Sequence, residues 1–305
     1  MSLSIENLLG LEDVPQADIN QIFDAAFSFR EVLERPVKKV PTLKGTTVVN
    51  LFFEPSTRTK NSFALAEKRL SADTVNFSAA SSSLQKGESL KDTIQNLCAM
   101  KIDLVVMRHP TPGSVKMLAD FVNAVIINAG DGTHEHPTQA LLDIMSLKEK
   151  FGQVQDLNVA IIGDIKHSRV ALSNIYGLKT MGANVMLCAP PPFMPVSVED
   201  LDVKVTYNVD EALEFADAVN VLRIQKERQA SGLIPSLREY RNRFGITLER
   251  VASLQKPITI LHPGPMNRQV EIDSAIADGE NAIILDQVLN GVAVRMAVLF
   301  LLSGS

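Results

Sequence analysis

Hydroxyl and guanidinium side chains gather in the stretch Glu54-Pro55-Ser56-Thr57-Arg58-Thr59-Lys60. The apolar and β-branched residues at 46–53 predict a buried strand before it, which a proline ends. Ser56 is a favoured helix N-cap, and the apolar periodicity of 58–70 predicts a helix. A helix N-terminus with free N–H groups, three hydroxyls and Arg58 predicts an anion site, most naturally for phosphate. Taken alone, the stretch also fits an ordinary capped helix with a solvated arginine.

Other polar groups follow predicted strands. Arg108 comes directly after the strand expected at 103–107, while Arg223 and Gln225 follow the strand expected at 218–222. In an open parallel sheet, ligands bind beyond the carboxyl ends of the strands. These positions therefore suit side chains that face a ligand, although charged residues after a strand are also common on solvated loops.

A histidine-rich turn opens another predicted helix. In His134-Glu135-His136-Pro137-Thr138-Gln139 the spacing is not that of a zinc motif and no C-x-x-C accompanies it. We expect His136 to donate a hydrogen bond to a ligand oxygen, with Gln139 one turn further on. Arg169 also begins a predicted helix, and the missing G-x-G-x-x-G around it weakens a dinucleotide interpretation.

Two loops complete the candidate set. The polar loop 81–89 carries Lys86, which could reach an anion, and the proline-rich turn 262–268 could accept hydrogen bonds from an amine through its backbone carbonyls. We find no apt nucleophile, P-loop, cofactor fingerprint or metal cluster in the sequence. The pattern suits a site that binds two small anionic substrates and lets them react with each other.

Alternating strand and helix signals predict the elements that position these residues. They indicate an α/β fold of two similar-sized domains, each a parallel sheet flanked by helices, with a seam near 130–134 and a site in the cleft between the domains. Strands are expected at 46–53, 74–78, 103–107, 125–128, 157–163, 183–189, 218–222, 257–261 and 282–285. Helices are expected at 15–34, 58–70, 89–101, 113–122, 137–150, 168–180, 209–216, 236–243, 247–254 and 286–303.

Composition bounds the class of protein. The chain has 305 residues, 46% of them apolar, so it can fill one large or two medium cores, and its net charge of −5 gives no general attraction for nucleic acid. Two cysteines in apolar segments favour a reducing compartment over a disulfide framework. With no signal peptide recognised and the most apolar run, 292–302, too short to span a bilayer, we expect a cytoplasmic protein without a membrane partner.

Seven short motifs in order resemble the aspartate carbamoyltransferases, a family in the second step of pyrimidine synthesis. The resemblance covers nearly the whole chain. Ornithine carbamoyltransferases share the S-T-R-T site but have cysteine where Thr138 stands and His-Cys-Leu-Pro where Gly264 lies, so both positions favour aspartate. The motifs are Phe52–Thr59, Lys86–Glu88, Met107–Pro110, Gly130–Gly132, His136–Gln139, Arg223–Arg228 and His262–Pro265.

The resemblance implies a role for each matching residue. It assigns residues 1–135 with 286–305 to a carbamoyl phosphate-binding domain and 136–285 to an aspartate-binding domain. It implies a homotrimer without metal or cofactor, and leaves open higher assembly through regulatory or dihydroorotase chains. Catalysis would fall to Thr59, Lys86, Arg108 and His136; carbamoyl phosphate binding to Ser56, Thr57, Arg58, Thr59, Arg108, His136, Gln139, Pro263, Gly264 and Pro265; aspartate binding to Lys86, Arg169, Arg223 and Gln225; the neighbouring subunit's contribution to Ser82 (or Ser83) and Lys86; and domain closure to Glu54, Arg169 and Arg228.

Two positions depart from the family pattern. Lys60 stands where arginine is usual, which keeps the charge but loses the planar fork, and Gln269 stands where glycine is common. Competing interpretations are a carbamoyltransferase for ornithine or an N-acylated amino acid, an NAD-dependent oxidoreductase, and a non-catalytic paralogue serving as an assembly subunit.

Overall fold

The computed structural model describes residues 3–78, 89–225 and 233–304, which divide into two compact units. Unit 1 comprises Met1–Leu142 and Leu289–Ser305, and unit 2 comprises Asp143–Val288. The chain passes from one unit to the other within helices α5 (Pro137–Phe151) and α11 (Ile284–Ser303). The boundaries of the two substrate-binding domains, placed after residues 135 and 285 from the sequence, stay a prediction.

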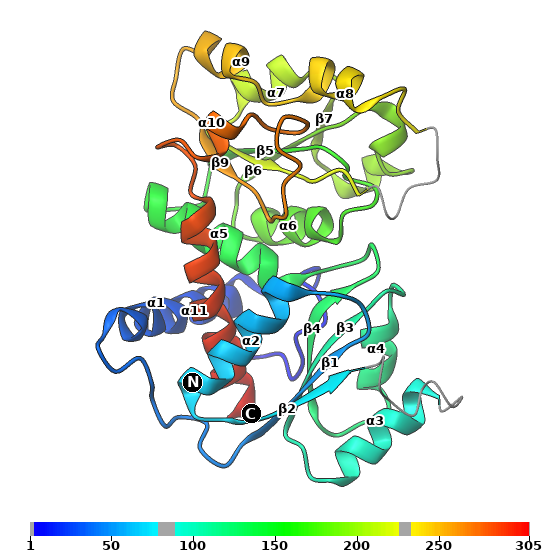
Figure 1. Cartoon of the computed structure of the whole chain (residues 1–305), viewed down its shortest axis with the longest axis vertical. Coiled ribbons are helices and arrows are strands. Elements are labelled where there is room, and N and C mark those ends of the chain that lie inside the picture. Colours follow the sequence, from blue (N-terminus) through cyan, green and yellow to red (C-terminus); the bar gives the residue numbers. More distant parts are fainter. Residues whose placement is uncertain (1–2, 79–88, 226–232, 305) are drawn as a thin grey trace. The chain divides into compact units, whose positions relative to one another are not determined.

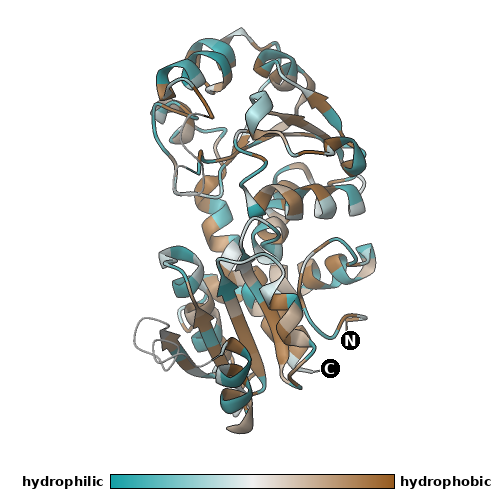
Figure 2. Ribbon diagram, turned by 90° about the vertical axis from the view of Figure 1, so that its right-hand side faces the viewer, coloured by the Kyte–Doolittle hydropathy of each residue, from teal (hydrophilic) through white to brown (hydrophobic). Residues whose placement is uncertain are grey.

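Unit 1 is built on a four-stranded parallel sheet in the order β2-β1-β3-β4 (Figure 1). On one face of the sheet, Val49 and Met107 pack with Ile94 of α3 and Val115 of α4. Figure 2 shows the strands as predominantly hydrophobic segments. The elements are α1 (Gln16–Glu34), β1 (Thr47–Phe52), α2 (Thr57–Leu70), β2 (Asp73–Ser78), α3 (Leu90–Ala99), β3 (Leu104–His109), α4 (Ser114–Ala119) and β4 (Val125–Asp131).

Unit 2 contains a five-stranded parallel sheet in the order β7-β6-β5-β8-β9. Its strands are β5 (Asn158–Ile162), β6 (Asn184–Cys188), β7 (Lys204–Thr206), β8 (Ala218–Val221) and β9 (Thr259–Leu261). Its helices are α6 (Arg169–Thr180), α7 (Val209–Phe215), α8 (Leu237–Phe244), α9 (Leu248–Ser253) and α10 (Ser274–Ala277), with 3-10 turns at η3 (Pro191–Phe193) and η4 (Val198–Leu201). Two parallel sheets with flanking helices confirm the predicted fold class.

One predicted strand is wrong, and two short elements are not predicted. The strand expected at 282–285 is wrong: Ala282 makes only an isolated bridge with Ile260, and Ile284 already begins α11. The sequence does not predict the edge strand β7 or the short helix α10. β7 is three residues long with two of them exposed, so it has no apolar run to reveal it.

Helix α11, predicted at 286–303, extends beyond the apolar run 292–302, which by itself is too short to span a bilayer. Among the described residues it is the one helix whose length and composition would allow it to cross a bilayer, and 67% of its most apolar window is buried inside the structure. Burial of this kind is typical of the core helix of a folded domain.

Candidate active site

The N-terminal end of α2 lies directly after β1, as the sequence predicts. Ser56 holds the N-cap position in an extended conformation (φ −155°) and makes no side-chain capping hydrogen bond. Thr57 and Arg58 are exposed in the first turn, whereas Thr59 is buried. The turn therefore presents backbone N–H groups, hydroxyls and a guanidinium together, which is the arrangement that binds an anion.

Strand order brings Arg108 to this turn. β1 and β3 are neighbours, so Phe52 pairs with Arg108, and the Phe53 N–H donates to the Arg108 carbonyl at 2.9 Å. The Arg108 Nη1 lies 3.5 Å from Thr59 Oγ1, and that oxygen lies 3.5 Å from Nε2 of the buried His136. Three of the side chains that the resemblance assigns to catalysis thus converge within unit 1.

Glu54 orients the Arg108 guanidinium. Its Oε1 accepts a hydrogen bond from Arg108 Nε at 2.6 Å, and both side chains are largely buried. Arg108 Nη1 also lies 3.5 Å from the carbonyl of Ala129. The resemblance implies a bridge from Glu54 to Arg169 and Arg228. The Glu54–Arg108 ion pair is not apparent from the sequence, because finding it requires knowing that β1 and β3 are adjacent.

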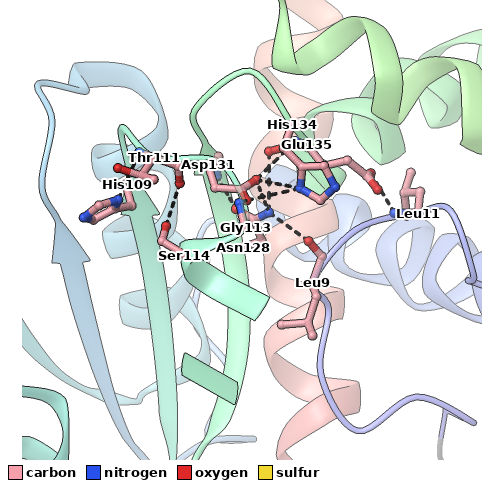
Figure 3. A network of polar contacts seen from close by, with 11 residues as sticks. Leu9, Leu11, His109, Thr111, Gly113, Ser114, Asn128, Asp131, His134 and Glu135 are labelled. Carbon is pink, nitrogen blue, oxygen red and sulfur yellow. Dashed lines mark hydrogen bonds and ion pairs between the residues drawn. The ribbon is translucent and has the colours of Figure 1, made fainter. Parts of the chain in front are cut away.

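A buried carboxylate organises the turn that precedes His136 (Figure 3). Asp131 accepts hydrogen bonds from Asn128 Nδ2 at 2.9 Å, the Glu135 N–H at 3.1 Å and the Gly113 N–H at 2.7 Å, and its Oδ2 lies 3.1 Å from His134 Nδ1. Burial by itself would raise the pKa of Asp131, but these hydrogen bonds hold it below its usual range. The hydrogen bond between His134 and Asp131 raises the pKa of His134 above its usual value.

Glu135 anchors this turn to the N-terminal segment. Its Oε2 accepts from the Leu11 N–H at 2.7 Å, and Asn128 Nδ2 also donates to the Leu9 carbonyl at 2.8 Å (Figure 3). A Cβ atom added at Gly10 would lie 2.1 Å from Glu135 Oε1, so a larger residue there would have to displace this carboxylate. The sequence suggested only turn residues here; their anchoring role depends on contacts more than a hundred residues apart.

The residues expected to bind aspartate lie in unit 2, where they follow the carboxyl ends of two neighbouring strands. Arg169 is buried at the first position of α6, and Gln225 follows β8 with Arg223 two residues earlier. Asp164, after the neighbouring strand β5, accepts from the Gln225 N–H at 3.2 Å and from His167 Nδ1 at 2.7 Å. The adjacency of β5 and β8 thus explains why Asp164 and Gln225, 61 positions apart, lie together at the carboxyl ends of these strands.

The remaining predicted residues divide into two groups. Gln139 lies in the first turn of α5, where its N–H donates to the His136 carbonyl at 2.9 Å, and Pro263, Gly264 and Pro265 form a turn after β9 with a cis bond between the last two. Outside the described residues lie Ser82, Ser83, Lys86 and Arg228. Across the described ranges, no group of three or more His, Cys, Asp or Glu side chains could hold a metal ion.

Comparison with known proteins identifies the class. Residues 6–149 match the model of the carbamoyl-P binding domain of aspartate/ornithine carbamoyltransferase, and residues 155–302 match the model of its Asp/Orn binding domain. The chain therefore belongs to the aspartate/ornithine carbamoyltransferase family, whose members are transferases.

Within that family the similar relatives share one description. The chain is 57% identical over 301 residues to the aspartate carbamoyltransferase catalytic subunit of Christiangramia forsetii, covering 99% of this chain and 97% of that protein. It is 56% identical over 303 residues to the catalytic subunit of Cytophaga hutchinsonii, covering 99% of each. The aspartate transcarbamoylase of Trypanosoma cruzi in complex with carbamoyl phosphate and aspartate has a TM-score of 0.88 at 31% identity, covering 97% of this chain and 96% of that one.

Proposed function

We propose that this chain transfers the carbamoyl group of carbamoyl phosphate to the α-amine of L-aspartate, giving N-carbamoyl-L-aspartate and phosphate. The observation that carries the proposal is the convergence of Thr59, Arg108 and His136 beside the N-terminus of α2. A phosphate at that terminus would lie next to three donors suited to a carbonyl oxygen. The similarity to aspartate carbamoyltransferase catalytic subunits supports aspartate as the acceptor.

The reaction needs positioning and charge stabilisation more than covalent help. The aspartate amine attacks the carbonyl carbon, a tetrahedral oxyanion forms, and phosphate leaves with the electron pair of the broken C–O bond. Because phosphate is already a good leaving group, no enzyme-bound intermediate is required. Thr59, Arg108 and His136 stabilise the oxyanion as donors, and the amine proton passes to a phosphate oxygen.

The other substrate contacts follow from the resemblance. Ser56, Thr57 and Arg58 hold the phosphate, while Gln139 and the carbonyls of the 263–265 turn hold the carbamoyl amine. The aspartate carboxylates are bound by Arg169, Arg223 and Gln225. Neither a metal nor a cofactor takes part in this scheme.

We also propose an oligomeric state and a cellular location for the protein. Ser82 (or Ser83) and Lys86 act in the site of a neighbouring subunit, and the active unit is the homotrimer that the resemblance implies. The chain works in the cytoplasm in de novo pyrimidine synthesis, where its product is the expected precursor.

Acceptor competition tests the proposal. Purified protein is given carbamoyl phosphate with equal concentrations of aspartate and ornithine, and both carbamoylated products are quantified. We expect product from aspartate alone. Product from ornithine would mean that Thr138 and Gly264 have been misinterpreted as selectivity residues, and no product from a folded trimer would favour the non-catalytic paralogue.

A further inference from the structure

The turn after β9 is held by hydrogen bonds that its backbone N–H groups donate to side chains. The His262 N–H donates to Oε1 of Gln287, on α11, at 3.0 Å, and the Gly264 N–H donates to His262 Nδ1 at 2.8 Å. The Gly264 N–H and the Pro263 carbonyl belong to one peptide plane and point in opposite directions. The contact with the His262 ring therefore fixes the direction in which the Pro263 carbonyl points.

The orientation of the Gln287 amide is set from its other end. Its Nε2 donates to Oδ1 of the fully buried Asp143 at 2.6 Å. A carboxylate only accepts hydrogen bonds, so the NH₂ group must face Asp143 and the amide oxygen must face His262. The second oxygen of Asp143 accepts from Asn174 Nδ2 at 2.9 Å and Asn220 Nδ2 at 3.1 Å, which holds the carboxylate in place.

The far end of the turn is fastened to a second buried acid. Glu271 Oε1 accepts from the Asn267 N–H and lies 3.6 Å from His262 Nε2, and the side chains of His262 and Glu271 are both fully buried. Since Nδ1 of His262 accepts a hydrogen bond, the N–H of the ring is at Nε2, facing Glu271. A half-turn flip of the ring would remove both the hydrogen bond from the Gly264 N–H and the contact with Glu271.

We propose that Gln287, oriented by Asp143, is a positioning residue that sets specificity for the donor substrate. The inference rests on the proposed function, in which the turn's carbonyls accept hydrogen bonds from the carbamoyl amine. Acetyl phosphate carries a methyl group in place of that amine. A methyl group cannot donate to the turn's carbonyls, so rigidly oriented carbonyls would be left unpaired and would disfavour acetyl phosphate. A more mobile turn would discriminate less between carbamoyl phosphate and acetyl phosphate.

The test variant is Gln287→Glu. Of two adjacent carboxyl groups one is held protonated, and the protonated carboxyl at position 287 reproduces the native donor towards Asp143 and the acceptor towards His262. At higher pH the two carboxylates repel and the link to His262 is disturbed. The measured quantity is the ratio of kcat/KM for carbamoyl phosphate to that for acetyl phosphate, with aspartate as acceptor.

We expect the ratio in Gln287→Glu to fall about tenfold at about pH 8.5, the effect of losing one well-formed hydrogen bond, and to approach the wild-type ratio at about pH 6. The titratable groups facing the turn are Asp143, His262 and Glu271. The wild-type protein measured at the same two pH values accounts for their own titration.

Asn174→Ala is the matched control. It removes a donor from the other oxygen of Asp143 and leaves the contact with Gln287 intact, so we expect lower stability with unchanged donor preference. Inorganic phosphate provides the second control. It lacks the amine, so its inhibition constant should be the same in the wild-type protein and in Gln287→Glu.

The outcomes separate the two proposals. If the wild-type protein does not carbamoylate aspartate, the proposed function fails and this inference fails with it. If the wild-type protein is active and Gln287→Glu keeps its donor preference at both pH values, only this inference is overturned; an equal loss in Asn174→Ala also overturns it. Should Gln287→Glu not fold, Gln287→Met removes the acceptor without adding charge, and the ratio should fall at both pH values.

Discussion

Thr59 is placed by two neighbours at once. Its hydroxyl lies 3.5 Å from both Arg108 Nη1 and His136 Nε2, and each neighbour has its own support. Glu54 holds the guanidinium of Arg108, and the Asp131 network holds the turn before His136. Donors fixed before the reaction begins stabilise developing charge without the cost of reorganisation.

His136→Ala tests this arrangement. The variant should fold normally and lose on the order of 100- to 1,000-fold in kcat, because one oxyanion donor contributes about 3 kcal/mol to lowering the barrier. Steady-state kinetics at saturating aspartate measure the effect. His134→Gln is the control, since His134 contacts Asp131 rather than Thr59, and a near-normal kcat for His136→Ala would disprove the donor role.

At the scale of elements, α2 joins the anion site to a buried acid. Glu67 on this helix is fully buried, and its Oε2 accepts from Asn50 Nδ2 of β1 at 3.0 Å and from Thr74 Oγ1 of β2 at 2.8 Å. Burial raises the pKa of Glu67 from 4.5 to about 7, although both hydrogen bonds act to lower it. The helix is thus fastened to the sheet by a group that favours its neutral form.

Glu67→Gln should flatten part of the pH dependence of stability. A raised folded-state pKa means that the contribution of Glu67 is fully present below about pH 4.5 and is lost as pH rises through about 7. At about pH 8, ionisation of Glu67 lowers the free energy of unfolding by on the order of 3 kcal/mol. The Glu67→Gln protein, whose amide stays neutral, should therefore be more stable than the wild-type protein at this pH. Urea unfolding across this range measures the difference; a parallel loss of stability in both proteins would contradict the raised pKa.

A second element-scale prediction concerns Gln269. Glycine is common there in the family that the sequence resembles, and the structure supplies the reason: Gln269 has a φ of +64°, in the left-handed region. Gln269→Gly should raise the free energy of unfolding by about 1 kcal/mol, since a side chain in this conformation is strained. Gln153→Gly, at an exposed residue outside the positive-φ set, provides a comparison. An unchanged or lower stability for Gln269→Gly would contradict the strain.

The sequence predicts most elements because their apolar runs are continuous, as in β1 and β5, or helically periodic, as in α1. It fails where that signal is weak: β7 is an exposed edge, and 282–285 is apolar but leads into a helix. The site residues are recognisable from motifs. Their supports are not, because the Glu54–Arg108 pair and the Asp143–Gln287 bond depend on strand order and on contacts between distant segments.

At the scale of the whole molecule, the proposed function requires more than one chain. Lys86 is assigned to a neighbour's site, whereas Arg58 serves its own. Trimers of Lys86→Ala alone and of Arg58→Ala alone should both be nearly inactive. Mixed trimers should recover part of the activity, because some sites then receive Lys86 from one chain and Arg58 from another. Kinetics after mixing, dissociation and reassembly test this, and no recovery in mixed trimers would mean that each site is built by one chain.

The proposed function requires the protein to bind a phosphate group and aspartate at the same time. N-(phosphonacetyl)-L-aspartate joins a phosphonate group, which stands in for the phosphate, to aspartate in one molecule, and a Trypanosoma cruzi aspartate transcarbamoylase has been solved in complex with it. Titration calorimetry with this compound is therefore the most direct measurement, using the wild-type protein and Arg58→Ala. We expect it to bind at least about 100-fold more tightly than phosphate or aspartate alone, and we expect this gain to be lost in Arg58→Ala. Binding no tighter than that of the separate parts would mean that the two substrates are not held together.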